Sequence, residues 1–523
     1  MTYSSEPTAP AVDLASTTSP SKDPKKLPVI IAGAGPCGLV AAATFQQRNI
    51  PFVIVEKVSR STICSNAGSG FELAPTAIEI LQEGLGIEVS NFLSTYEGMC
   101  FMTVEGKTFR TAVLPSHYKG GSVNRAEMQN FLLEHLFASP EDEEGVLLCG
   151  SGIDSYREVE EGGKIKTLVV KLASGRELVG CALLACDGIH SKCRSVMHPP
   201  ETDPLHYCNS ICYWGKTLAS NGSNLEREFK KTQQHTLQQQ SSSADPKEGH
   251  PVTTHKTSFV LAMATPKVPA VLFIVPSKSS QDDHGTMLNW GLTIASKTPP
   301  AARKDGGDST RRGGGVLTEA QKTELLSFGK HLPGGDNGRR WSGWCGKRNS
   351  TGSLLEGIQD FPLLEELLKV TPAREITEAG FYDRKNLDLP FTSKGKLVAL
   401  LGDAAHPQTP YLGQGVNMAI TDAYIYASVI ADCLDKNNPS HGGDLPSAIG
   451  WCDVESRRKS SKTNVRMARF VCDLSNSSNR LVCWLFGRFI KSISPEEFVH
   501  QINNTDSSNR KFWEYFQRRQ QST

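Results

Sequence analysis

The stretch that decides the fold runs from Leu27 to Lys57 and reads LPVIIAGAGPCGLVAAATFQQRNIPFVIVEK. Its apolar, β-branched run Val29–Ala32 predicts a buried strand. A glycine-punctuated turn follows, and then a helix-forming stretch, Leu39–Gln47. A second apolar run, Phe52–Val55, predicts another buried strand. A strand, a helix and a strand in this order form a βαβ unit, so we expect an α/β fold built on a parallel sheet.

The turn between the first strand and the helix carries the pattern GxGxxG at Gly33, Gly35 and Gly38. Gly33 permits a tight turn, Gly35 lets the backbone approach a pyrophosphate, and Gly38 lets the helix pack closely on the strand. Glu56 ends the next strand, where its carboxylate would accept hydrogen bonds from an adenosine ribose and disfavour a 2′-phosphate. Lys57 follows it and is included in the expected site. The alternative is a glycine-rich turn without a ligand, but in this context the pattern predicts NAD or FAD rather than NADP.

Two further predicted strands, far along the chain, end in a glycine and an aspartate. The apolar run 181–186 ends in Asp187-Gly188, and the run 397–401 ends in Gly402-Asp403. An open α/β sheet places ligand-binding groups at the carboxyl ends of its strands. Either aspartate alone could cap a helix or form an Asx turn. Together with GxGxxG they indicate one extended nucleotide site, which an NAD-dependent dehydrogenase with a single contiguous nucleotide domain does not explain.

The composition argues against several other classes of protein. The 56 basic and 55 acidic residues nearly cancel, so we expect no nucleic-acid partner. The 14 cysteines show no paired zinc-binding spacing, so no metal is expected. Residues 1–26 are rich in Ser, Thr and Pro and lack the apolar segment of a signal peptide, so they predict a disordered tail. No apolar run is long enough to span a bilayer. We therefore expect a soluble, cytoplasmic protein.

The finer patterns predict individual elements. Residues 72–92 and 124–138 are expected to be helices, the second with Asn124 as its N-cap. The segment 480–493, RLVCWLFGRFIKSI, has an apolar face with basic flanks. We interpret it as a packed C-terminal helix, and a membrane-surface helix is the alternative. Further strands are expected near 146–149, 167–172, 258–263 and 270–275.

The three motifs, in this order, resemble those of the FAD-dependent class A monooxygenases, the para-hydroxybenzoate hydroxylase-like aromatic hydroxylases. The resemblance covers about residues 27–205 and 380–430, and its most specific part is GDAAHPQTPYLGQGVNMAITDA. The segment VNRAEMQNFLLEHL is similar to the family's arginine segment, which implies that Arg125, helped by Gln129, lies near the flavin pyrophosphate or ribityl chain. Gly70, in SGFELAP, falls in the family's loop after the ribose-binding strand.

The resemblance implies a Rossmann-like FAD-binding domain with an interleaved β-sheet substrate domain and C-terminal helices. We expect a tail at 1–26, a discontinuous FAD-binding domain at 27–205 and 385–450, a substrate domain at 206–384, and a helical region at 451–523. Two polar, aromatic-poor segments, 219–256 and 297–316, predict surface insertions between strands of the substrate domain.

The resemblance also implies how FAD is held. Glu56 would bind the ribose, Asp403 would contact the ribityl or pyrophosphate region, and Asp187 would serve both FAD and transiently bound NAD(P)H. The loop Pro410–Asn417 would wrap the isoalloxazine ring, with His406 shaping the turn rather than acting in catalysis. The expected cofactor-binding residues are Gly33, Gly35, Gly38, Glu56, Lys57, Gly70, Arg125, Gln129, Asp187, Gly402, Asp403, Gly413, Gly415, Val416 and Asn417.

In this family NAD(P)H reduces the flavin, O2 adds at the flavin C4a carbon, and the hydroperoxide transfers one oxygen atom to the substrate. The resemblance therefore implies hydroxylation or epoxidation of a mid-sized apolar or aromatic molecule, in secondary metabolism. In NSICYWGK, Tyr213 is the candidate catalytic residue, and Trp214 stands where relatives often carry arginine. An isoprenoid epoxidase of the same cofactor class and a flavin-binding interaction protein without activity remain alternatives. The absence of a WxWxIP stretch argues against a flavin halogenase.

Overall fold

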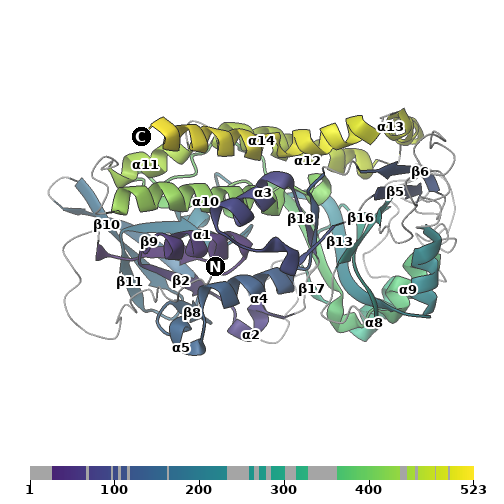
Figure 1. Ribbon diagram of the computed structural model, residues 1–523, viewed down its shortest axis with the longest axis horizontal. Coiled ribbons are helices and arrows are strands. Elements are labelled where there is room, and N and C mark those ends of the chain that lie inside the picture. Colours follow the sequence, from purple (N-terminus) through teal and green to yellow (C-terminus); the bar gives the residue numbers. More distant parts are fainter. Residues whose placement is uncertain are drawn as a thin grey trace, which may run out of the picture.

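The structure is a computed structural model of the 523-residue chain (Figure 1). The predicted tail, apart from residue 26, lies outside the described residues. So do residues 233–257 and 301–313 of the two predicted insertions. The described residues are 26–65, 70–95, 98–103, 108–114, 118–161, 164–232, 258–263, 270–277, 284–300, 314–327, 362–435, 444–453, 457–477, 479–492 and 495–522.

The βαβ unit predicted from Leu27–Lys57 is part of a five-stranded parallel sheet. Its strands run in the order β19-β12-β1-β2-β8, so the strands that end in Glu56, Asp187 and Gly402-Asp403 lie within one sheet. Because the sheet is parallel, their carboxyl ends meet at the same edge. The strands are β1 (Val29–Ala32), β2 (Phe52–Glu56), β8 (Leu147–Cys149), β12 (Ala182–Ala185) and β19 (Val398–Leu400).

Alternate residues of the parallel sheet feed two separate cores. Val29 and Ile31 pack into the larger core with three helices, whereas Ile30 and Ala32 pack against a three-stranded antiparallel sheet on the other face. This alternation follows from the two-residue period of a strand buried on both sides. The helices are α1 (Pro36–Gln47), α4 (Arg125–Leu136) and α10 (Gly415–Leu434), and the second sheet consists of β9 (Ile153–Glu161), β10 (Lys164–Leu172) and β11 (Glu177–Gly180).

A large, mostly antiparallel sheet of eight strands forms the second part of the molecule, beside the parallel sheet (Figure 1). Its order is β17-β18-β13-β16-β15-β14-β5-β6, and two helices, α8 (Glu319–Ser327) and α9 (Pro362–Val370), pack with it around an apolar core. The strands are β5 (Gly98–Thr103), β6 (Thr108–Val113), β13 (Leu205–Ser220), β14 (Ser258–Met263), β15 (Ala270–Ser277), β16 (Gly285–Ala295), β17 (Gly314–Val316) and β18 (Thr377–Arg384).

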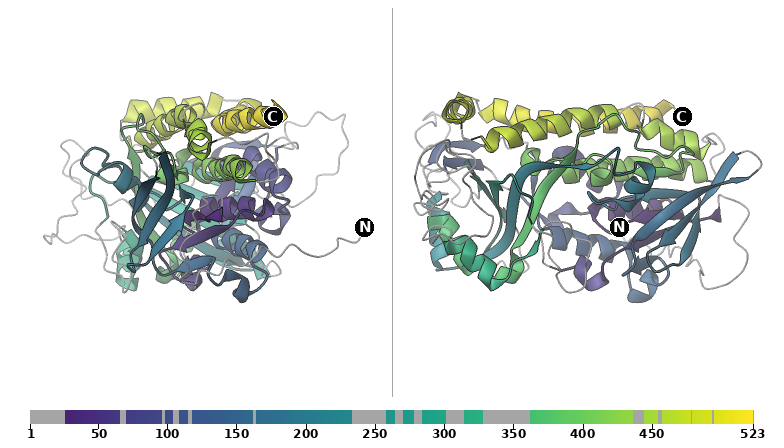
Figure 2. Two further views of the ribbon diagram at one scale, coloured as in Figure 1. Left: turned by 90° about the vertical axis from the view of Figure 1, so that its left-hand side faces the viewer. Right: turned by 180° about the vertical axis from the view of Figure 1, so that it is seen from behind.

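Smaller elements complete the described fold. A three-stranded sheet consists of β3 (Phe71–Leu73), β7 (Gly121–Val123) and β4 (Leu93–Ser94). Short helices are α2 (Arg60–Ile63), α5 (Pro140–Glu143) and α6 (Lys192–Met197). After α10 the described chain is helical, and α12 and α14 run along one side of the molecule in Figures 1 and 2. These helices are α11 (Leu445–Cys452), α12 (Arg458–Ser475), α13 (Arg480–Ser492) and α14 (Pro495–Ser522). Among the described residues, no helix combines the length and the apolar composition needed to cross a membrane.

The helix predicted at 72–92 is wrong at both ends. Its first residues pair as strand β3, and the helix α3 (Pro75–Glu79) begins only at the proline, which is suited to the first helical position but disfavours helix before it. The π-helical turn Ile80–Gly84 continues it and ends before Gly86, whose φ of +69° is the left-handed conformation that stops a helix. The helix predicted at 124–138 is confirmed as α4, and the Asn124 side chain accepts hydrogen bonds from the Ala126 and Glu127 backbone.

The ends of the two predicted insertions also differ from the prediction. Residues 219–220 complete β13, and residues 224–232 are helical because Leu225 and Phe229, one turn apart, are buried in the core of the large sheet. Residues 314–316 form the edge strand β17, which pairs with β18. In both cases a few apolar or strand-forming residues at the margin of a polar segment are held by the sheet beside them.

The interpretation of 480–493 as a packed helix is wrong for one of its faces. The helix α13 exists, but the side chains of Leu481, Trp484, Leu485 and Phe489 are each more than half exposed. The helix therefore projects an apolar stripe away from the core.

Candidate functional site

The glycine loop after β1 has the geometry that a bound pyrophosphate requires. Gly33 has a φ of +96°, and a Cβ there would lie 2.6 Å from the carbonyl oxygen of Cys186. A Cβ on Gly38 would lie 1.9 Å from the carbonyl oxygen of Gly33, so only glycine allows α1 to pack on the strand. A Cβ on Gly35 would meet no heavy atom of the described chain within 4 Å. The space above Gly35 is thus open, as close approach of a phosphate demands.

Three side chains surround this loop. The Glu56 carboxylate accepts a hydrogen bond from the Ala34 backbone N–H at 2.7 Å and from the Val58 N–H at 3.0 Å. On the other side Gln129 Nε2 donates to the Ala34 carbonyl oxygen at 3.1 Å, and Arg125 Nε donates to Gln129 Oε1 at 2.9 Å. The structure therefore brings Glu56, Gln129 and Arg125 together at the glycine loop.

Asp187, at the end of β12, carries an unused acceptor. Its Oδ2 accepts the backbone N–H groups of Lys192 and Cys193 at 2.9 and 3.2 Å, while its buried Oδ1 has no hydrogen-bond partner among the described residues. Burial raises the pKa of the Asp187 carboxyl. A buried carboxylate oxygen without a partner is costly, so the site calls for a ligand that donates a hydrogen bond there. Gly188, which follows, faces open space on its Cβ side.

Asp403 lies at the turn after β19. Asp403 is exposed to solvent, and yet the surrounding protein partly desolvates its carboxyl and so raises the pKa of that group. This combination is typical of an acid that is open on one side and enclosed by protein on the others. The preceding Gly402 has a φ of +55°, and a Cβ there would lie 2.9 Å from Cβ of Ala419, so glycine is required where the turn packs on α10.

The loop Pro410–Asn417 is fixed by Asn417. The Asn417 side chain donates to the carbonyl oxygens of Gly413 and Glu72 at 2.7 and 3.0 Å and accepts the Ala74 N–H at 2.8 Å. Gly413 has a φ of +63°. The N-cap residue of α10, Gln414, makes no side-chain capping bond among the described residues, so the first N–H groups of this long helix are not satisfied by that cap.

The remaining predicted cofactor residues lie around these groups. A Cβ on Gly415, at the start of α10, would lie 4.0 Å from Oδ1 of Asp403, so the loop approaches the acid closely. Val416 follows it and is partly buried. A Cβ on Gly70 would collide with the Val123 carbonyl oxygen and with the Asn289 side chain of the large sheet, so Gly70 lies where the two parts of the molecule meet. Lys57 is exposed, and a Cβ on Gly152 would lie 3.0 Å from its own Cβ.

Sequence reasoning missed a buried arginine that connects two of the motifs. Arg194, in α6 just after Asp187, donates from Nη1 to the carbonyl oxygens of Ala404 and Ala405, at 2.9 and 2.5 Å. Its Nε donates to Asp203 at 2.6 Å. The helix after the Asp187 motif is thus bonded to the turn that presents Asp403. The arginine in CALLACDGIHSKCRS was visible in the sequence, but the two carbonyl oxygens that accept from it are more than 200 residues away.

His406 has a structural environment, in keeping with the role expected from the sequence. It is 2% exposed, and its Nε2 lies 2.7 Å from Oδ2 of Asp422 on α10. Asp422 also pairs with Arg457 and accepts the Gly402 N–H at 3.0 Å. Burial alone would raise the pKa of Asp422, but Arg457 and His406 hold it below its ordinary value. This buried network ties the turn after β19 to α10 and to the segment before α12.

An apolar surface of the large sheet lies against the loop Pro410–Asn417. Trp214 packs on Phe381, with ring centroids 6.1 Å apart, and Phe381 packs on Tyr411 of the loop at 6.0 Å. Cys212 belongs to the same cluster. The Tyr411 hydroxyl is buried and makes no hydrogen bond to a described residue, and burial raises its pKa well above the ordinary value. We call this group, Cys212, Trp214, Phe381 and Tyr411, the aromatic cluster.

Tyr213 lies on the opposite face of the sheet. It pairs across the strands with Leu292, whose side chain belongs to the core under α8 and α9. Its hydroxyl donates to Oε1 of Glu378 at 3.0 Å. Adjacent residues of a strand point to opposite faces, so placing Trp214 in the aromatic cluster turns Tyr213 away from it. The structure therefore does not bring Tyr213 together with the other predicted site residues.

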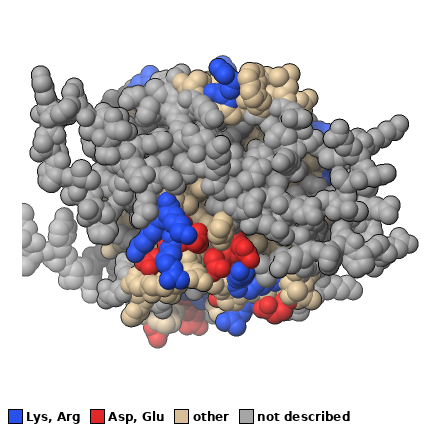
Figure 3. Space-filling view, turned by 90° about the vertical axis from the view of Figure 1, so that its right-hand side faces the viewer, with Lys and Arg blue, Asp and Glu red and all other residues tan. Residues whose placement is uncertain are grey.

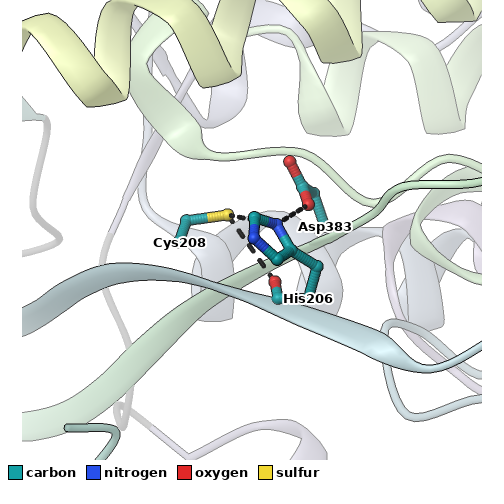
Figure 4. Close-up of side chains that lie close together, drawn as sticks. All are labelled: His206, Cys208 and Asp383. Carbon is teal, nitrogen blue, oxygen red and sulfur yellow. Dashed lines mark hydrogen bonds and ion pairs between the residues drawn. The ribbon is translucent and has the colours of Figure 1, made fainter. Parts of the chain in front are cut away.

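A separate group of possible metal ligands lies between β13, β18 and α12 (Figure 4). His206 Nδ1 lies 2.8 Å from Oδ1 of Asp383, and Cys208 Sγ lies 4.0 Å from His206 Nδ1. The other oxygen of Asp383 accepts from Arg469 of α12 at 2.5 Å, and burial raises the pKa of the Cys208 thiol, which keeps it protonated. The carboxylate is already paired with an arginine, and a protonated thiol is a poor metal ligand. We therefore interpret this group as an ion-pair network that holds α12 on the sheet, rather than as a metal site.

Taken together, these features form a nucleotide-type site. A parallel sheet presents a glycine loop, Glu56 and two aspartates along one edge, and the loop after β19 leads from that edge to the aromatic cluster of a second sheet. Residues 26–202 and 375–441 match the model of the FAD binding domain family. These two segments are an FAD-binding domain, and the predicted α/β, Rossmann-like FAD-binding fold is confirmed.

Comparison with individual proteins gives the wider class. The chain is 22% identical over 459 residues to the FAD-dependent monooxygenase notI of Aspergillus sp. (strain MF297-2), covering 84% of this chain and 81% of that protein. It is 23% identical over 477 residues to the aurachin C monooxygenase/isomerase of Stigmatella aurantiaca, covering 90% of this chain and 95% of that protein. The chain is thus related to FAD-dependent monooxygenases, which confirms the resemblance found in the sequence.

A solved structure shares the fold. The structure of Klebsiella pneumoniae HpxO complexed with FAD and uric acid superposes with a TM-score of 0.62 at 16% identity, covering 92% of this chain and 97% of that chain. At this identity the likeness concerns the fold, and it extends well beyond the two segments matched by the family model.

Proposed function

We propose that this protein is an FAD-dependent monooxygenase that uses NAD(P)H and O2 to hydroxylate or epoxidise a mid-sized apolar or aromatic molecule. The observation that carries the proposal is the buried Oδ1 of Asp187, which has no partner among the described residues. It shares a sheet edge with the open space above Gly35 and with the solvent-exposed Asp403, whose carboxyl is partly desolvated. Other buried carboxylates of the described chain also have an unpaired oxygen, so it is the position of this one beside the open glycine loop and Asp403 that favours a bound dinucleotide.

The described residues suggest how FAD would be held. The glycine loop and the N-terminus of α1 would receive the pyrophosphate, because the free N–H groups of a helix start attract anions. Glu56 would bind the ribose, and Asp187 and Asp403 would accept hydrogen bonds farther along the molecule. The loop Pro410–Asn417, held by Asn417, would present the N-terminus of α10 to the flavin ring, where its dipole favours the negative charge of reduced flavin.

Bound FAD would supply the oxygen-activating chemistry, and NAD(P)H would reduce the FAD. The role of the chain's own residues is to bind the substrate, orient it and exclude water. The aromatic cluster suits an apolar or aromatic substrate, because its described side chains are apolar apart from a thiol, an indole N–H and the Tyr411 hydroxyl. That hydroxyl, which has no hydrogen bond to a described residue, could donate a hydrogen bond to the substrate or accept one from it. Tyr213, the catalytic candidate from the sequence, faces away from this surface.

Two other functions are compatible with the same fold and cofactor site. Epoxidation of an isoprenoid needs the same cofactor site and an apolar surface, so the substrate alone separates it from aromatic hydroxylation. A flavin-binding protein without activity is disfavoured by the aromatic cluster, which an inactive binder would not need to keep beside the flavin loop.

The test is a substrate screen with the FAD-loaded protein. Phenols, indoles and terpenoids are supplied with NADH or NADPH, and O2-dependent oxidation of the nicotinamide is followed at its absorbance band. We expect a subset of these compounds to stimulate oxidation and to give products heavier by one oxygen atom. Flavin that is bound but reduced at the same slow rate with every compound, and no oxygenated product, would support the inactive binder.

A further inference from the structure

The C-terminal helices carry most of the exposed large apolar side chains. Eight such side chains are exposed among the described residues, and six of them lie on α12 and α13. The two on α12 are Met467 and Phe470, which are 48% and 58% exposed. The four on α13 are Leu481, Trp484, Leu485 and Phe489, with exposed fractions of 61%, 56%, 52% and 55%. An exposed apolar surface gathered on two consecutive helices marks a contact surface.

The four residues of α13 form a single stripe. Their spacing of three, four and eight residues from Leu481 places them on one side of the helix. Arg488 lies on the same side, and its guanidinium carbon lies 5.3 Å from the centroid of the Trp484 ring. By sequence the helix Arg480–Ser492 contains three basic residues and no acidic one. Figure 3 shows tan and blue atoms at the upper edge of this side of the molecule.

We propose that this surface, Met467, Phe470 and the stripe of α13, docks on an anionic lipid bilayer. A short helix with tryptophan and large apolar residues on one side, flanked by arginine and lysine, is the composition that lies in the headgroup region of a membrane. Cations and an indole ring beside one another suit that region, where anionic headgroups meet acyl chains. The helix has 13 residues, too few to span a bilayer, so it lies on the surface.

The charge of α13 argues against a second copy of the chain as the occupant. In a symmetric dimer formed through this stripe, the same surface would meet itself. Arg488 would then face the cations of the partner helix, and like charges across an apolar contact weaken it. An anionic bilayer has the opposite charge and accepts the apolar side chains as well.

The docking surface is connected to the aromatic cluster through α12. On the inner side of this helix, Cys472 is fully buried and belongs to one apolar cluster with Cys212, Phe381, Trp214 and Tyr411. The Ala468 carbonyl oxygen, between the exposed Met467 and Phe470, accepts a hydrogen bond from Thr409 Oγ1 at 2.9 Å. One helix thus separates the bilayer from the substrate surface. If the proposed function holds, an apolar substrate dissolved in the membrane would reach the site along α12.

Vesicle flotation of the full-length FAD-loaded protein tests the docking, and it needs no turnover. The vesicles are pure phosphatidylcholine or phosphatidylcholine with about a third phosphatidylserine, at low and at high salt. We expect flotation with the anionic vesicles at low salt, and weaker flotation at high salt or with the neutral vesicles. Failure of the protein to float with anionic vesicles at low salt would overturn the proposal.

Variants distinguish binding through this surface from non-specific adsorption of the protein to vesicles. Trp484→Ser combined with Phe489→Ser should lower the partition coefficient on the order of tenfold or more, and Arg488→Glu should lower it by roughly tenfold. The matched control is Val370→Ser, which removes an apolar side chain 47% exposed at the end of α9 and should change nothing. Equal binding by the double variant and by the control would contradict the proposal.

Further measurements identify what binds this surface and test the docking proposal separately from the proposed function. Trp484→Phe should still float but lose part of the tryptophan quenching by brominated lipids, whereas unchanged quenching would place Trp484 outside the bilayer and contradict the docking mode. A dimer that forms without vesicles and is abolished by the double variant would replace the bilayer by a second copy. Flavin content and NAD(P)H oxidation without vesicles report on the proposed function alone, so the two proposals can fail separately.

Discussion

Arg194 donates a hydrogen bond from Nη1 to the carbonyl oxygen of Ala404 at 2.9 Å. The two residues are 210 positions apart, and each follows one of the aspartates at the carboxyl edge of the sheet. The contact ties the orientation of the Asp187 motif to that of the Asp403 turn. The pairing of β12 with β19 and this buried guanidinium, which also pairs with Asp203, therefore hold the two halves of the expected FAD site together.

Replacement of Arg194 should disturb both the fold and the flavin. Arg194→Ala leaves the Asp203 carboxylate buried with one partner fewer, and breaking a buried pair in this way costs about 3 kcal/mol or more of unfolding free energy. We expect a lower denaturant midpoint and less bound FAD. Arg194→Lys should restore part of the stability but not both carbonyl contacts, and Arg176→Ala, in an exposed turn, should match the natural protein.

Asp403 should contribute to flavin binding. Asp403→Asn keeps the shape of the side chain and removes its charge, so it weakens a charge-assisted hydrogen bond to FAD. We expect the Kd for FAD to rise about 10- to 100-fold and the purified protein to be pale. Flavin titration of the apoprotein measures this. Asp388→Asn, an exposed acid paired with Lys462, is the control, and full colour in the Asp403 variant would refute the role given to this turn.

Asp403→Asn should also change how the unfolding free energy of the apoprotein depends on pH. Desolvation by the surrounding protein raises the pKa of the solvent-exposed Asp403 above its ordinary value of 3.8 in the folded state. An acid whose folded pKa is raised stabilises the fold below the unfolded pKa, and that stability is lost as the pH rises through the folded pKa. Apo Asp403→Asn should therefore be at least as stable as the natural apoprotein at pH about 7, and the difference should vanish near pH about 3. Denaturant unfolding at several pH values tests this, and a variant less stable at neutral pH would contradict it.

Tyr411 and Tyr213 form a matched pair for locating the substrate. Tyr411→Phe removes a hydroxyl that has no partner in the described structure, so folding and FAD content should not change. If this hydroxyl hydrogen-bonds the substrate, kcat/KM should fall by about tenfold. Tyr213→Phe removes a hydrogen bond to Glu378 on the opposite face and should affect stability more than kcat/KM. The reverse order of effects would restore Tyr213 as the catalytic tyrosine.

The parts of the fold predicted correctly from the sequence are those whose signals are local. The strand–turn–helix–strand unit at Leu27–Lys57, the N-cap Asn124 and the strand ends at Asp187 and Asp403 each depend on neighbouring residues. The rule that parallel strands present ligand-binding groups at one edge then brings Asp187 and Asp403 into one sheet, although their sequence positions are far apart.

The features that the sequence did not predict depend on distant partners. Nothing near Arg194 indicates the carbonyls of Ala404 and Ala405, and nothing near residues 98–113 indicates that β5 and β6 join the large sheet through β14. Tyr213 and Trp214 were adjacent candidates, and only the pairing of β13 with β16 shows which of them faces the flavin loop. The apolar stripe of α13 has the pattern of a packed helix, and its exposure is a property of the assembled fold.

The most direct test of the central claim is the origin of the oxygen in the product. The FAD-loaded protein is supplied with NAD(P)H, a compound that stimulates its oxidation, and O2 labelled with the heavy oxygen isotope. We predict a product that carries one labelled oxygen atom, and no product when the Asp403→Asn variant is supplied without added FAD. A protein that takes up no FAD, or a product whose new oxygen comes from water, would contradict the assignment of this chain as a flavin monooxygenase.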